Sequence, residues 1–182
     1  MSLDLTPRDY LEMLTEEYRE YQEHWQAVVT VAVGSGTKTR LEARRYRVSM
    51  RKAINCCALS NALPEIIFTQ YGDTEPQKVH NAKSHNAYRD YLQTQCTAHL
   101  TVRDICEFSK HGPTLWRKSV SVQDAKRIKR KEGFLAGLLK LPMEREVERL
   151  EVRHGDGRTE FLDEILEQVI TSWKTIFDRD KL

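Results

Sequence analysis

The sequence predicts a mainly α protein, a helical bundle with a small β-hairpin before the C-terminal helix. Apolar residues recur every three or four positions over residues 11–32, 43–57 and 162–177, which is the spacing of one helix face. The turn Gly155-Asp156-Gly157 separates two short alternating segments, which is typical of a hairpin. The 182 residues, of which 40% are hydrophobic, suffice for one domain with its own core.

The first predicted helix covers residues 7–33. It begins at Thr6-Pro7, where the hydroxyl can cap the helix and proline occupies the first helical position, and Asp9 completes a variant of the capping box. The second helix is predicted over residues 39–63 and ends at Pro64, because proline has no amide hydrogen to continue the backbone ladder.

A loop over residues 71–83 is predicted to lead into a single third helix, residues 86–110, which Gly112-Pro113 ends. Residues 119–122 alternate like a strand, residues 146–153 and 158–161 form the hairpin, and the last helix covers residues 162–177. The stripes of the best-defined helices predict these core residues: Leu14, Tyr18, Trp25, Ile54, Cys57, Leu166, Val169 and Trp173.

Charge is divided into blocks although the net charge is only +2. Residues 38–52 and residues 117–131 each hold seven bases and one acid, whereas residues 1–33 and 144–167 each have a balance of −5. Such blocks either pair with each other or present a polarised surface.

Several classes of protein are excluded on the sequence. The longest nearly apolar stretch, residues 27–33, is far short of the roughly 20 residues that a membrane span requires. No signal-peptide pattern is present, and the four cysteines show neither a disulfide framework nor a CxxC spacing. We therefore expect a cytoplasmic protein with buried, reduced thiols. His80 and His85 lack metal-ligand spacing, so we expect neither a metal nor a cofactor.

One constellation of chemically competent residues stands on the third predicted helix, at intervals of four: His99, Arg103, Glu107 and His111. Histidine titrates near neutral pH and arginine binds phosphate, so this edge suits phosphodiester cleavage. Polar residues at this spacing are also what a solvated helix face looks like, with Arg103 and Glu107 as a surface pair. Both interpretations stay open on the sequence.

Residues 96–111, CTAHLTVRDICEFSKH, resemble a stretch in bacterial helical-bundle proteins of the HEPN type. In that family the stretch reads arginine-aspartate, two apolar positions, asparagine, then lysine-histidine. The Asp-Gly hairpin followed by a helix with a late tryptophan, here Trp173, is similar too. The resemblance implies one HEPN-like helical domain over residues 1–182, a bundle that often dimerises and, in many members, RNA cleavage by an arginine and a histidine. Here seven residues separate Arg103 from His111, and Glu107 stands at the asparagine position.

Two basic stretches are candidates for binding a phosphate backbone. The first is a stripe on the second helix, and the second precedes the hairpin: Arg40, Arg44, Arg47 and Arg51, then Lys126, Arg127, Lys129 and Arg130. Alternatively, these bases pair with the acidic first helix and the acidic tail.

Two function classes follow. The first is a nucleic-acid-linked module of toxin–antitoxin or defence type that binds RNA or cleaves it. The second is a non-enzymatic helical protein that self-associates or holds a protein partner. Whether the chain is an enzyme stays open, and a homodimer is expected in either class because the helices offer long apolar stripes.

Overall fold

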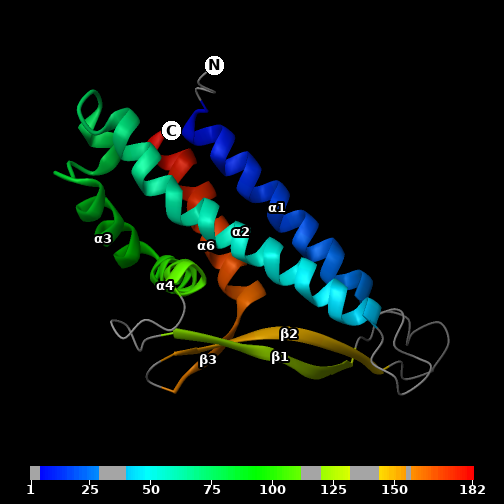
Figure 1. Ribbon diagram of the computed structural model, residues 1–182. Helices are drawn as coiled ribbons and strands as arrows, with labels where there is room; N and C mark the ends of the chain where they lie inside the picture. The colour runs from blue at the N-terminus through cyan, green and yellow to red at the C-terminus, as the bar shows by residue number, and fades with distance from the viewer. Residues whose placement is uncertain (1–4, 29–39, 112–119, 132–143, 155–156) are drawn as a thin grey trace.

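The structure, a computed structural model, describes the backbone of residues 5–28, 40–111, 120–131, 144–154 and 157–182, and the side chains of residues 5–23, 48–107, 150–154 and 157–182. Figure 1 shows a helical bundle with a three-stranded sheet lying across one end. The elements are α1 (Pro7–Val28), α2 (Arg40–Tyr71), the 3-10 helix η2 (Pro76–Val79), α3 (His85–Gln95), α4 (Ala98–His111), β1 (Val120–Lys131), β2 (Glu144–His154), β3 (Thr159–Phe161) and α6 (Leu162–Asp180).

The mainly α fold class, with strands directly before the C-terminal helix, is confirmed. Helices α1 and α2 run antiparallel, α6 packs against both, and α3 and α4 lie on the other side of α2 (Figure 1). The predicted capping box opens α1, since the Asp9 amide donates to Thr6 Oγ1 (3.3 Å) and the Thr6 amide donates to Asp9 Oδ2 (2.7 Å). Residues 29–33 of the first predicted helix lie outside the described chain. No described helix has a stretch long and apolar enough to cross a membrane.

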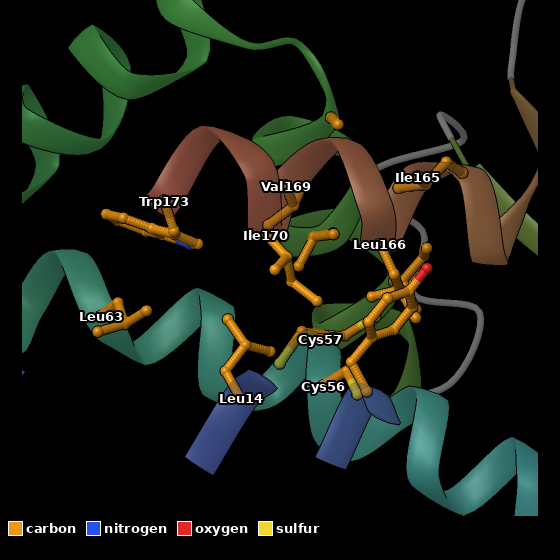
Figure 2. Close-up of a cluster of buried hydrophobic side chains, with 14 of the residues drawn as sticks. Leu14, Cys56, Cys57, Leu63, Ile165, Leu166, Val169, Ile170 and Trp173 are labelled. Carbon is orange, nitrogen blue, oxygen red and sulfur yellow. The ribbon is translucent and has the colours of Figure 1, made fainter. Parts of the chain in front are cut away.

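The core lies between α1, α2 and α6, where side chains from all three helices converge (Figure 2). Six predicted core residues are buried there, namely Leu14, Tyr18, Cys57, Leu166, Val169 and Trp173. Ile54 was predicted wrongly, because it is only half-buried and Ala53, Cys56 and Cys57 occupy the inward face of α2. The Trp25 side chain lies outside the described part. The indole nitrogen of Trp173 has a hydrogen-bond partner in the core, because Nε1 donates to the buried Ser60 Oγ at 2.9 Å.

The prediction that the second helix ends at Pro64 is wrong, since α2 continues to Tyr71. Proline removes one amide from the backbone ladder and crowds the preceding turn. Arg89 of α3 donates from Nη2 to the carbonyl oxygen of Asn61 in that turn, at 3.2 Å. Leu63 and Ile67, on either side of the proline, are fully buried, so packing favours a continuous helix.

The single third helix was also predicted wrongly, because α3 and α4 are separate helices that part at Cys96 and Thr97. Cys96 has extended backbone and closes α3 by donating its amide to the Leu92 carbonyl oxygen at 3.0 Å. Thr97 then precedes α4, a position at which threonine is a favoured cap. The chain turns at this break, so that α3 and α4 lie at different angles against α2 (Figure 1).

The strands extend further than the predicted hairpin. The predicted pairing of β2 with β3 is confirmed, with Val152 opposite Glu160 and a positive φ of 86° at Gly157, which suits glycine. Residues 155–156 of the turn are not described. The basic segment before the hairpin was not assigned to a strand, yet all of residues 120–131 form β1, antiparallel to β2. A β-bulge interrupts this pairing between Gln123 and Lys126, where two residues of β1 face one of β2.

Candidate functional site

The predicted catalytic edge begins in the protein interior. His99, in the first turn of α4, is only 8% exposed. Its Nε2 lies 3.0 Å from Ser172 Oγ of α6, and its ring meets Trp173 edge-on with 4.9 Å between centroids. Burial lowers the pKa of His99 to about 4, so the imidazole is neutral at physiological pH. The interpretation of this edge as a solvated helix face is therefore wrong at His99.

The other members of the edge follow along α4. Arg103 and Glu107 are half-buried, and Glu107 interacts with a partner. His111 is the last residue of α4, and its side chain lies outside the described part of the chain. Catalysis by these residues stays a prediction.

His99 and Arg103 line a small cavity of about 20 Å³ together with Arg89 of α3. The sequence reasoning missed Arg89 because it treated residues 86–110 as one helix. Along a continuous helix, residues 89 and 103 would stand about 21 Å apart. The break at Cys96 and Thr97 lets α3 and α4 approach the same part of α2. The only sequence signal for that break was Thr97, a β-branched polar residue in the middle of the predicted helix.

His80, which lacks metal-ligand spacing in the sequence, is part of a polar cluster. Its Nε2 lies 2.9 Å from Asp180 Oδ2, and its ring stacks on Tyr91 with 4.1 Å between centroids. Arg179 binds the same carboxylate, with Nε 2.7 Å from Asp180 Oδ1. This cluster fastens the loop after α2 to the end of α6. Among the described residues, no group of three or more histidines, cysteines or carboxylates is placed to hold a metal ion.

The basic stripe of α2 is described only in part. Arg51 is exposed, while the side chains of Arg40, Arg44 and Arg47 lie outside the described part. The neighbouring Lys52 forms ion pairs with Glu20, at short distance, and with Glu17 at 3.8 Å, both on α1. The hydrogen bond with Glu20 raises the pKa of Lys52. Pairing of basic α2 with acidic α1, the alternative considered on the sequence, therefore occurs at Lys52.

The register of β1 against β2 sorts the second basic stretch into two rows. Successive residues of a strand point to opposite faces, and residues directly opposite on antiparallel strands share a face. In the inner row each base faces a glutamate: Arg127 faces Glu148, Lys129 faces Glu146 and Lys131 faces Glu144.

The outer row has the opposite character. Here Lys126 faces Arg149, Ile128 faces Val147 and Arg130 faces Arg145, so that like charges stand directly opposite each other on both sides of one apolar pair. Arg153 continues this row on β2 and is exposed, and Glu151, which is buried, is its one acid.

Two buried residues of β2 show which row shares a face with the helical core. Leu150 and Val152 are fully buried in the core and belong to the same face of β2 as the inner row. By strand alternation, the outer row belongs to the opposite face of β2 from Leu150 and Val152. Of the four bases predicted here from the sequence, Lys126 and Arg130 stand in the outer row, whereas Arg127 and Lys129 stand opposite glutamates.

A wider groove of about 610 Å³ runs along α6 beside the end of α3. Ser172, the partner of His99, lies in its wall, with Cys96 and Arg179 also lining it. Glu164 and Glu167 line it as well, so the groove is mixed in charge.

The expected homodimer rested on apolar helix faces that the bundle leaves uncovered. In the described part of the chain, the large apolar side chains that are exposed are Leu5, Met13 and Leu100, on or beside α1 and on α4. They do not form one stripe, and the homodimer stays a prediction.

Comparison with protein-family models, with curated proteins and with solved structures found no match.

Proposed function

We propose that this protein binds RNA through phosphate contacts with the outer row of the β1–β2 sheet. The observation that carries the proposal is the register, which sets Lys126 opposite Arg149 and Arg130 opposite Arg145. Like charges directly opposite each other destabilise an antiparallel pair, by a few tenths of a kcal/mol to about 1 kcal/mol. A row that keeps two such pairs in succession is suited to an anion that neutralises them.

The inner row, in which each base stands opposite a glutamate, differs from the outer row in charge. Three bases there stand opposite three glutamates, so the strands themselves supply the countercharge. In the outer row, five bases accompany one acid. An extended basic face of this kind matches the repeated charges of a phosphate backbone.

The same row indicates how binding works. Neither β1 nor β2 contains a phenylalanine, tyrosine or tryptophan, the residues on which unpaired bases stack. Contacts with the backbone alone carry no sequence information, so we expect weak, salt-sensitive binding without sequence preference. RNA, as opposed to DNA, is favoured by the resemblance of residues 96–111 to HEPN proteins.

The proposal does not extend to cleavage. The imidazole of His99 is neutral and buried, and its Nε2 is already engaged by Ser172. A non-enzymatic RNA-binding role needs neither this histidine nor a cofactor.

Two variants that carry the same net charge test the proposal. The first, Arg130→Gln with Arg149→Gln, removes two bases from the outer row, and the second, Arg127→Gln with Lys129→Gln, removes two from the inner row. Fluorescence anisotropy with a labelled single-stranded RNA, repeated over a range of salt concentrations, measures the affinity of each.

We expect the outer-row variant to bind more weakly and the slope of log K against log salt to fall by about 1.4, as for two lost contacts with a single strand. The inner-row variant should retain most of the affinity. Equal losses in the two variants would show that only net charge matters, and wild-type binding that ignores salt would refute the proposal.

A further inference from the structure

The small cavity between α2, α3 and α4 combines hydrogen-bond donors with three apolar side chains in its lining. Two guanidinium groups, Arg89 and Arg103, line it together with the amide side chains of Asn61 and Gln93. Among the described residues that line it, none is acidic. The ion-pair partner of Arg89, Glu65, lies with Oε2 3.6 Å from Arg89 Nη2, and its side chain is 64% exposed. Two cations therefore line one small cavity, and none of the described residues that line it supplies a counterion.

Arg89 has a donor that no other group uses. Its Nη2 donates to the Asn61 carbonyl oxygen, but its Nε is buried and has no hydrogen-bond partner among the described residues. A buried donor without an acceptor costs free energy, and more so on a charged group. Because Arg89 also lines the cavity, this nitrogen is a candidate donor to an acceptor that enters it.

Two further groups favour an acceptor there. Ser60 also lines the cavity, and because its oxygen accepts from Trp173 Nε1, its own proton is available for donation. His99, in the first turn of α4, is one of the lining residues, and the helix dipole is positive at that end and stabilises negative charge. The cavity volume of about 20 Å³ admits a single oxygen atom, and the remainder of a larger group would stay at the mouth.

We propose that Arg89 and Arg103 form a binding site for one phosphate group, which inserts one oxygen between them. Arginine forks suit this geometry because they bind phosphate with two parallel hydrogen bonds. The phosphate belongs either to free inorganic phosphate or to a nucleic acid. The site does not rest on the proposed sheet interface, which lies on different elements.

Thermal unfolding in phosphate, compared with chloride at equal ionic strength, provides the first test. At about 100 times Kd, bound phosphate should raise Tm by roughly 5 °C or more. Phosphate also stabilises proteins non-specifically, so the decisive comparison is between variants. Arg103→Gln should lose the specific rise, whereas Arg19→Gln, which removes a charge from the exposed face of α1, should keep it.

A second measurement requires no variant. In the wild-type protein, titration with inorganic phosphate should shift the Nε–H resonance of Arg89 in a ¹H–¹⁵N spectrum, because that donor gains a partner. An unchanged resonance, or a rise in Tm that Arg103→Gln retains in full, would overturn the proposal and leave a cavity that holds only water.

Oligonucleotides distinguish the two sources of phosphate. A short RNA with a 5′-phosphate should compete with inorganic phosphate at the Arg89 resonance more strongly than the same RNA with a 5′-hydroxyl if the site binds nucleic-acid ends. Equal competition by the two RNAs would assign the site to free phosphate. The outer-row variant of the sheet should retain the response to inorganic phosphate, so failure of one proposal is distinguishable from failure of the other.

Discussion

The helical core and the β1–β2 sheet treat polar and charged residues in different ways. In the core, two buried polar pairs join neighbouring helices, Trp173 with Ser60 and His99 with Ser172. In the outer row of the sheet, by contrast, bases stand directly opposite bases.

This difference between the core and the outer row shows where the requirements of stability and of binding conflict. Removing a core residue leaves a cavity or an unsatisfied partner, so substitution there should destabilise the fold. Removing charge from the outer row relieves repulsion, so substitution there should stabilise the fold and weaken binding, a trade-off that is common at functional surfaces.

The largest effect is expected at Trp173. Its side chain is fully buried, donates to Ser60 and packs edge-on against His99 and Phe177. Trp173→Ala should lower the free energy of unfolding by about 3–5 kcal/mol, as measured by urea denaturation. Lys174→Ala, at the exposed neighbouring position, is the control and should change it little. A small loss at Trp173 would show that α6 does not anchor the core.

A smaller effect should appear as a pH dependence from His99. Its pKa falls from the ordinary value of 6.5 to about 4 on burial, so between these values the unfolded chain binds a proton that the folded protein rejects. The contribution of His99 is complete above about pH 6.5 and is lost as pH falls toward 4. The 2.5-unit difference corresponds to roughly 3 kcal/mol.

Denaturation over this pH range in wild type and in His99→Gln measures the effect. The variant removes the titrating group, and its stability should therefore fall less steeply between pH 6.5 and pH 4. Identical slopes would mean that His99 does not titrate in this way and that other groups cause the pH dependence.

The sequence allowed much of the bundle to be predicted, because helix periodicity and capping are local signals. The stripes of α1 and α6 and the Thr6–Asp9 cap needed no tertiary information. Pro64 misled because the burial of Leu63 and Ile67 on either side of it favours a continuous helix. The division of α3 from α4 depends on packing against α2, which no local pattern records.

The candidate sites were harder to predict for the same reason. The basic character of residues 126–131 was evident, but its separation into two rows depends on strand register and on the bulge after Gln123. Likewise, Arg103 was predicted from the sequence to hold a phosphate, whereas Arg89 lines the same cavity only because of the turn at Cys96 and Thr97. Sequence reasoning identified residue types, and non-local pairing decides which of them meet.

The most direct test of the contrast measures unfolding and RNA affinity together in two single variants. Arg145→Glu turns the like-charged pair with Arg130 into an opposite pair, and Lys129→Glu turns the matched pair with Glu146 into a repulsive one. Both change the net charge by −2. We predict that Arg145→Glu raises the free energy of unfolding by about 0.5–1 kcal/mol and weakens RNA binding, whereas Lys129→Glu lowers the stability by a similar amount and weakens binding less. Equal changes in stability and in affinity for the two variants would contradict this account.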